Sequence, residues 1–226
     1  MHIFLDIGFT LMGGPAFSPP KMIRKILNLG EDDSAVLYDI IFCENHHTPD
    51  SLMVSLEKRL GCRISRDQQK DIAAFWQRQF LDVYELEGAS VFIKNLARSG
   101  AYLHIISNLW FPFYNKFRTV FQNDLNNIRT KTLSFEEGIR KPCAEIYRRA
   151  LDRAKALPEE SVMVGDSVGN DILPCAELGM KCVWFKSRPV EKHQLESKRL
   201  LLSKYDDIFE VNSLRAAQSV IERFLK

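Results

Sequence analysis

Short apolar runs and longer stretches with helical periodicity alternate along this chain of 226 residues. The first apolar run covers residues 3–5 and leads directly into Asp6. A run of this kind predicts a strand that is buried on both faces and that presents the next polar residue at its carboxyl end. In an open α/β sheet, ligands bind outside those carboxyl ends. On this stretch alone, an Asp that only opens a turn before Gly8 explains the pattern equally well.

The stretch from about residue 19 to residue 86 predicts helices only. Pro19-Pro20 precede apolar residues at helical spacing, and a second helix is expected over about 33–43. Thr48-Pro49 is typical of an N-cap followed by proline at the first helical position. Ser65-x-x-Gln68 is a capping box that predicts the start of a fourth helix. We expect the aromatic residues of this helix in the core of the helical block.

From Gly88 onward, predicted helices and strands alternate. The expected strands cover residues 102–106, 128–133, 162–164, 182–185 and 208–209; the expected helices cover 89–99, 142–154 and 172–178 and begin near 112 and 214. This alternation implies right-handed crossovers and a mostly parallel sheet, and therefore an α/β fold. The helical block is then an insertion after the first strand. The charged run at 186–199 is expected to be a solvated helix face.

Composition and charge narrow the class of protein. The net charge is +2, so no strong field recruits nucleic acid or an anionic membrane. The five cysteines are scattered and odd in number, which argues against a disulfide framework. No apolar stretch is long enough to cross a bilayer, and Asp6 interrupts an N-terminal run that no Lys or Arg precedes. We therefore expect a cytoplasmic protein without nucleic-acid or membrane partners.

Polar residues follow three of the predicted strands, and in a parallel sheet these strand ends meet at one rim. They are Asp6, Ser107 and Asp166; Asp171 follows five residues after Asp166, and Lys141 stands before a proline that is expected to open a helix. Clustered carboxylates repel one another unless a cation neutralises them, and Mg²⁺ is the hard cation that suits such oxygen ligands. A lysine and a hydroxyl beside them suit a phosphoryl group, because they donate to its oxygens as charge develops.

Four ordered segments of the chain resemble the four motifs of the haloacid dehalogenase superfamily of hydrolases. The segments are Asp6-Ile-Gly8-Phe-Thr10-Leu, Ser107-Asn108, Arg140-Lys141-Pro142 and Gly165-Asp166-Ser-Val-Gly-Asn170-Asp171. The helical insertion resembles the α-helical cap of the subfamily that includes phosphoglycolate phosphatases and haloacid dehalogenases. The resemblance implies a Rossmann-like core formed by residues 1–14 and 88–226, and a helical cap formed by residues 15–87.

The resemblance also implies roles for the residues of the first three motifs. Asp6 would be the nucleophile that forms an aspartyl-phosphate, a covalent route open to carboxylates. Lys141 would hold Asp6 and the transferring group by its charge. Ser107 would donate to the phosphoryl oxygens. Thr10 and Asn108 would belong to the same phosphate- and substrate-binding set, and Thr10 would act by ordering its loop.

The metal ligands implied by the resemblance come from the first and fourth motifs. They are the carboxylates of Asp6 and Asp166 and the backbone carbonyl of Gly8, with Asp171 either as a further ligand or as a partner that supports the ligands. The implied cofactor is Mg²⁺, and the implied partner is a small phosphorylated molecule. The sequence carries no signature that names this molecule, and both a monomer and a homodimer are open.

Gly8 is the one marked departure from the family's phosphatases, which carry an Asp at this position as general acid and base. General acid–base catalysis of this kind raises the rate by about two to four decades. Three interpretations are open: the protein acts on substrates with good leaving groups; another group, with His46 and His47 of the cap as candidates, supplies the proton; or turnover is weak and the protein binds ligand in a regulatory role.

A dehalogenase is the alternative hydrolase, because the family's 2-haloacid dehalogenases also lack the second Asp. They use no metal, however, and their fourth motif lacks the Gly165-Asp166 pattern, while Phe9 stands where they carry glycine. Acids left unpaired without a cation are costly, so the pattern favours a phosphatase. For the segment Trp110-Phe111-Pro112-Phe113, pocket lining, a subunit contact and plain packing are all open.

Overall fold

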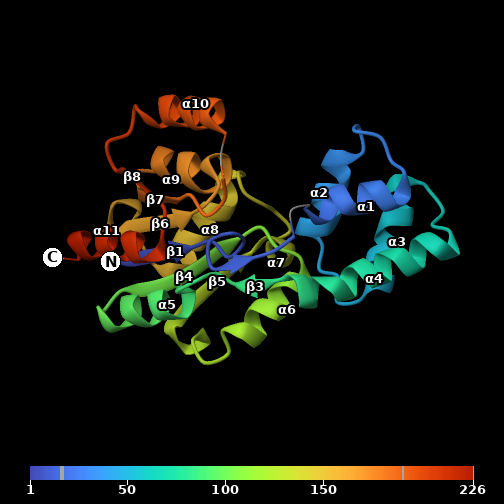
Figure 1. Ribbon diagram of the computed structural model, residues 1–226, viewed down its shortest axis with the longest axis horizontal. Helices are drawn as coiled ribbons and strands as arrows, with labels where there is room; N and C mark the ends of the chain where they lie inside the picture. The colour runs from blue at the N-terminus through green and yellow to red at the C-terminus, as the bar shows by residue number, and fades with distance from the viewer. Residues whose placement is uncertain (16–17, 190, 226) are drawn as a thin grey trace.

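The computed structural model describes residues 1–15, 18–189 and 191–225 and contains a central sheet of six parallel strands (Figure 1). The spatial order of the strands is β5-β4-β1-β6-β7-β8. Their bounds are His2–Leu5 (β1), Tyr102–Ser107 (β4), Ile128–Leu133 (β5), Ser161–Gly165 (β6), Lys181–Phe185 (β7) and Ile208–Val211 (β8). The α/β class and the parallel sheet predicted from the alternating pattern are therefore confirmed.

Helices cover both faces of this sheet, which explains why its strands are apolar on both sides. Ile3 and Leu5 of β1 belong to one buried cluster, and Phe4 between them belongs to a second. The first cluster includes residues of α5 (Ala89–Arg98), α6 (Phe111–Val120) and α11 (Leu214–Phe224). The second includes residues of α8 (Ala144–Ala154), α9 (Leu173–Glu177) and α10 (Lys192–Leu202).

Several predicted boundaries of the core were wrong. Pro142 does not open α8, which begins at Ala144, because Cys143 has the non-helical backbone of an N-cap. Residues Ser134–Glu137, for which no helix or strand was predicted, form the short helix α7. The predicted helix over 172–178 is a π-helical turn at Val168–Ile172 followed by α9.

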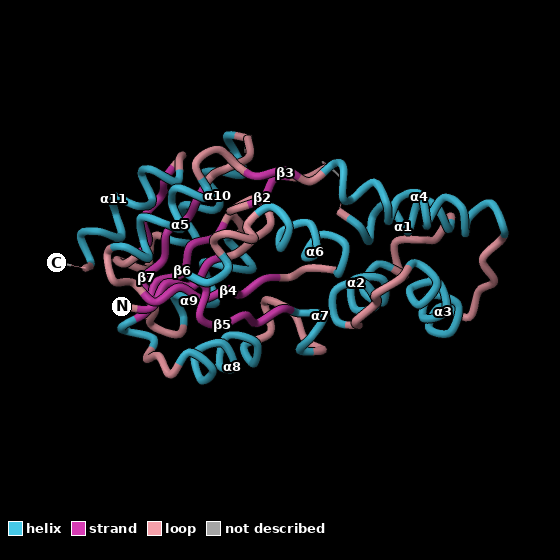
Figure 2. Tube along the Cα trace, turned by 90° about the horizontal axis from the view of Figure 1, so that it is seen from below, coloured by secondary structure: helices cyan, strands magenta, loops and turns pink. Residues whose placement is uncertain are grey.

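Four helices form a separate lobe beyond the carboxyl ends of the strands (Figure 2). They are α1 (Pro19–Leu27), α2 (Ser34–Cys43), α3 (Pro49–Leu60) and α4 (Arg66–Asp82). Thr48 and Ser65 cap α3 and α4 with reciprocal hydrogen bonds, as the sequence predicts. We call this lobe the helical cap; its division from the core as a domain of residues 15–87 stays a prediction. No described helix is both long and apolar enough to span a bilayer.

A two-stranded antiparallel ribbon joins the ends of the insertion. Its strands are β2 (Met12–Gly13) and β3 (Tyr84–Glu85). Two-residue strands are too short to show a period in the sequence, so the prediction missed them. The ribbon brings the chain entering the helical cap beside the chain leaving it.

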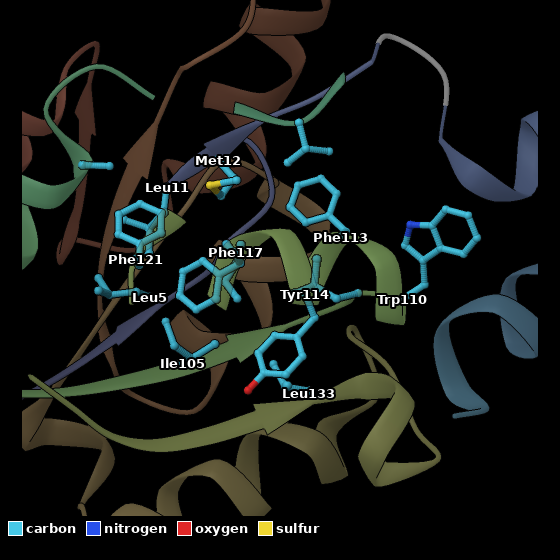
Figure 3. Packing of buried hydrophobic residues seen from close by; sticks show 14 of the residues in the cluster. Leu5, Leu11, Met12, Ile105, Trp110, Phe113, Tyr114, Phe117, Phe121 and Leu133 are labelled. Carbon is cyan, nitrogen blue, oxygen red and sulfur yellow. The ribbon is translucent and has the colours of Figure 1, made fainter. Parts of the chain in front are cut away.

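The helical cap contacts the core through an aromatic cluster at the start of α6. The indole of Trp110 stacks with Phe75 at 5.5 Å between ring centroids and meets Trp76 edge-on at 5.1 Å. Figure 3 shows Trp110 at the end of a buried series that continues through Phe113 and Tyr114 into the core. Phe75 and Trp76 of α4 thus pack against the core as well as within the cap.

Candidate active site

The site is built at the carboxyl end of β1, where two neighbouring strands flank the first motif. Leu5 is in register with Ile105 of β4 on one side and with Val164 of β6 on the other. The Asp6 backbone N–H continues this pairing by donating to the Val164 carbonyl at 3.0 Å. The ends of β4 and β6 are therefore brought beside Asp6.

Three side chains hold the Asp6 carboxylate. Its Oδ1 accepts from Ser107 Oγ at 2.8 Å and from Lys141 Nζ at 2.7 Å. Its Oδ2 has only a long contact, 3.4 Å, from Thr10 Oγ1. Both hydroxyl residues are fully buried, and neither lines the cavity in front of Asp6. The structure thus places Ser107 and Thr10 behind the carboxylate, and their direct contact with phosphate stays a prediction.

Lys141 is almost completely buried and uses all three of its N–H groups. Besides Asp6, its Nζ contacts Asp171 Oδ1 at 2.5 Å and donates to the Ile106 carbonyl at 3.1 Å. Burial disfavours the ammonium, but the charges of Asp171 and Asp6 outweigh burial and raise the pKa of Lys141. Its positive charge is therefore fixed at the centre of the acidic cluster.

Asp171 reaches this centre because Gly165 has no side chain. A Cβ on Gly165 would lie 2.5 Å from the Asp171 side chain. The other carboxylate oxygen of Asp171, Oδ2, accepts from the Ser167 backbone N–H at 2.9 Å. Burial raises the pKa of Asp171, and Lys141 opposes this rise.

Asp166 lies at the mouth of the site and meets Arg188, which the sequence analysis did not select. The Arg188 guanidinium contacts Asp166 Oδ2 at 2.5 Å and lies 4.0 Å from the centre of the Phe9 ring. Burial, followed by the charge of Asp6, raises the pKa of Asp166 to about 6 even beside Arg188. Arg188 belongs to the charged run predicted as a helix face, but it precedes α10 in a loop, so the sequence offered no signal for this contact.

The three carboxylates form a donor set that suits a divalent cation. One oxygen from each of Asp6, Asp166 and Asp171 lies within 4.8 Å of the other two. Gly8 lines the same cavity, so its backbone borders the cluster. Three acids face two cations, the buried Lys141 ammonium and the Arg188 guanidinium, and a hard cation with oxygen ligands would neutralise the remaining negative charge. These residues therefore fit the predicted Mg²⁺.

A cavity of about 390 Å³ opens in front of this cluster, between the core and the helical cap. Its wall includes Tyr38 and Gln79 from the cap and Trp110 and Phe113 from the core. The aromatic segment after Ser107 therefore both lines a pocket and packs. Gln79 was missed by the sequence analysis, although a buried amide three residues after Trp76 on an amphipathic helix was an available signal.

The two histidines considered as proton donors lie elsewhere. His46 is buried and contacts the Ile40 carbonyl at 3.0 Å through its Nε2. His47 packs edge-on against Phe111 with 4.4 Å between ring centroids. Neither histidine lines the cavity. The interpretation in which they replace the acid missing at Gly8 therefore has no support from the geometry.

Comparison with known proteins agrees with this core. A family model described as haloacid dehalogenase-like hydrolase matches residues 43–185, more than half of the chain. The chain therefore belongs to the haloacid dehalogenase-like hydrolases. The matched region contains Ser107, Lys141 and Asp166 and does not extend to Asp6.

Individual relatives are phosphatases by name. The glyceraldehyde 3-phosphate phosphatase of Pyrococcus furiosus is 28% identical over 153 residues, which is 67% of this chain and 60% of that protein. The chain thus matches three fifths of the length of this curated relative.

A HAD phosphatase structure from Thermococcus onnurineus is 15% identical, covers 97% of both chains and has a TM-score of 0.58. A HAD family enzyme of Bacteroides thetaiotaomicron, solved with magnesium and inorganic phosphate, is 19% identical, covers 85% of this chain and 97% of its own, and has a TM-score of 0.58. At these identities, the two solved structures establish the fold alone.

Proposed function

We propose that this protein is a Mg²⁺-dependent phosphatase that removes phosphate from a small phosphorylated molecule through an aspartyl-phosphate on Asp6. The observation that carries the proposal is the Asp6 carboxylate, which lines the cavity while Lys141 holds its Oδ1 and two further carboxylates lie within 4.8 Å. The names of the curated relatives support a phosphorylated substrate, and glyceraldehyde 3-phosphate is the first compound to test.

The hydrogen bonds to Asp6 select its attacking atom. Ser107 and Lys141 both engage Oδ1, whereas Oδ2 has only the 3.4 Å contact from Thr10. Oδ2 is thus the freer oxygen to form the bond to phosphorus while the bond from phosphorus to the leaving oxygen breaks. Water then attacks the aspartyl-phosphate, releasing inorganic phosphate and restoring the carboxylate.

Charge stabilisation comes from the fixed groups around Asp6. The Lys141 ammonium is already in place and needs no reorganisation when negative charge develops, which is the condition for effective electrostatic catalysis. Asp6, Asp166 and Asp171, with the Gly8 carbonyl, would hold Mg²⁺, which when bound would neutralise charge on the phosphoryl oxygens. Gly8 offers no acid to the leaving oxygen, so esters with good leaving groups are expected to react fastest.

The test is phosphate release from p-nitrophenyl phosphate, acetyl phosphate and glyceraldehyde 3-phosphate. We expect Asp6→Asn and EDTA each to abolish release, while Asp32→Asn, at an exposed position outside the cavity, leaves it intact. Mg²⁺ should also raise the melting temperature of the wild type and have little effect on Asp166→Asn. Turnover in EDTA, turnover by Asp6→Asn, or metal-free halide release from 2-chloropropionate would each contradict the proposal.

A further inference from the structure

Two residues that line the cavity each carry a buried N–H donor without a hydrogen-bond partner among the described residues. The donors are Nε2 of Gln79, from α4 of the helical cap, and Nε1 of Trp110, at the start of α6. Gln79 is 1% exposed and Trp110 is 3% exposed, and both residues line the same cavity as Asp6. The donors therefore come from opposite sides of the contact between cap and core.

Leaving such donors unpaired is costly. A buried polar group without a partner destabilises the fold, and most buried polar groups in folded proteins are satisfied. The packing restricts both side chains. Phe75 and Trp76 contact the Trp110 ring, and Gln79 lies one turn after Trp76 on the same helix, α4. Both donors are thus unpaired beside the cavity, where an acceptor on a bound molecule would satisfy them.

The chemistry of the donors limits what this acceptor is. An amide N–H and an indole N–H are neutral, and Trp contributes no acceptor at this atom. A phosphate is bound most strongly by charged partners such as arginine, which neither of these two residues supplies. A hydroxyl or carbonyl oxygen is matched by neutral donors and needs no counter-charge.

We propose that Gln79 and Trp110 form a subsite that donates hydrogen bonds to a hydroxyl or carbonyl oxygen on the carbon chain of the phosphorylated substrate. This inference rests on the proposed function, which places the phosphate at Asp6 in the same cavity. A substrate that carries this oxygen satisfies both donors, whereas an analogue without it leaves them buried and unpaired. Sites built to bond a substrate hydroxyl reject analogues that lack it more strongly than hydrophobic pockets reject a size difference.

Glycerol 1-phosphate and n-propyl phosphate are the probes, because they share a three-carbon chain and a primary phosphate ester and differ only in two hydroxyls. Binding is measured by titration calorimetry with Mg²⁺ in the Asp6→Asn protein, in which no turnover is expected. We expect glycerol 1-phosphate to bind at least tenfold more tightly. Adding Gln79→Leu or Trp110→Phe should reduce this ratio severalfold, whereas Gln77→Leu, at an exposed position on the same helix, should leave it unchanged.

Stability provides an independent readout. Replacing an unpaired buried amide with an apolar side chain of similar size removes a desolvation penalty, so Gln79→Leu should melt no lower than the parent protein. Equal affinity of the parent for both probes, or an unchanged affinity ratio in both Gln79→Leu and Trp110→Phe, would overturn the subsite. Failure of the proposed function is separate, because it appears as absence of p-nitrophenyl phosphate hydrolysis by the wild type whatever the binding ratio.

Discussion

Asn108 and Lys141 pair through two reciprocal hydrogen bonds between a side-chain amide and a peptide backbone. Asn108 Nδ2 donates to the Lys141 carbonyl at 2.9 Å, and the Lys141 backbone N–H donates to Asn108 Oδ1 at 2.8 Å. Asn108 directly follows β4, so this pair ties the loop carrying Lys141 to the sheet edge beside Asp6. Asn108, predicted as a substrate-binding residue, also lines the cavity, and we propose that it positions Lys141.

Asn108→Ala removes both of these bonds and frees the Lys141 loop. Because a displacement of about 1 Å can cost about 100-fold in rate, we expect kcat for p-nitrophenyl phosphate to fall about 10- to 100-fold. Steady-state kinetics measure the effect. Asn123→Ala, at an exposed position, is the control. Activity within twofold of the wild type would show that the amide pair does not position Lys141.

Gly8→Asp tests whether the missing acid limits turnover. Apart from the adjoining residues, no atom lies within 4 Å of a Cβ built on Gly8, so a Cβ can be added there without displacing a neighbour. If proton supply is limiting, hydrolysis of alkyl phosphates should increase by up to two to four decades, the usual range for general acid–base catalysis. Gly8→Asn has nearly the same shape without a proton to exchange and should give no gain. Equal rates for the two variants would mean that the gap at Gly8 is not limiting.

Lys141→Met leaves Asp6 and Asp171 buried without their common cation. Breaking a buried ion pair from one side typically costs about 3–5 kcal/mol, and we expect a loss of this size in the free energy of unfolding in EDTA. Adding Asp171→Asn removes one of the stranded charges and should recover part of the stability. Activity should stay absent in both variants.

Urea unfolding of the wild type, Lys141→Met, Asp171→Asn and the double variant separates charge balance from catalysis. Lys25→Met, at an exposed position of α1, is the control and should change stability little. A double variant no more stable than Lys141→Met alone would contradict the assignment of Lys141 as the charge that balances Asp171.

His104 is predicted to make the fold sensitive to acid. It is buried in β4, where Nδ1 contacts Thr130 Oγ1 at 2.8 Å and Nε2 contacts His2 Nδ1 at 3.1 Å. Burial, then the charges of His2 and Arg129, lower its pKa to about 4 from the ordinary histidine value of 6.5. Between these values the unfolded chain binds the proton and the folded chain does not, so stability falls as the pH falls.

The expected loss from this one group between pH 7 and pH 4 is at most about 3 kcal/mol, at about 1.4 kcal/mol for each pKa unit. His104→Asn keeps a polar atom near Thr130 and cannot take up a proton. Unfolding free energies measured at several pH values should therefore fall less steeply for His104→Asn than for the wild type. Parallel curves would rule out His104 as the source.

The sequence by itself determined the sheet and much of the acidic cluster. Apolar runs ending in Asp6, Ser107 and Asp166 specify buried parallel strands, and parallel strands place their carboxyl ends at one edge. The positions of these residues therefore follow from local pattern together with a general rule of α/β folds. The resemblance of the ordered motifs added the roles of Lys141 and Asp171 in the site.

Only the tertiary structure decided what each group touches. Gln79 and Arg188 come from α4 and from the loop after β7, segments far from the motifs in sequence, and no local period predicts where their side chains meet the site. No local period predicts the contacts of Thr10, His46 and His47 either. Short-range patterns specify helices and strands, whereas the packing of the cap on the core decides which polar atoms face the cavity and which are buried behind it.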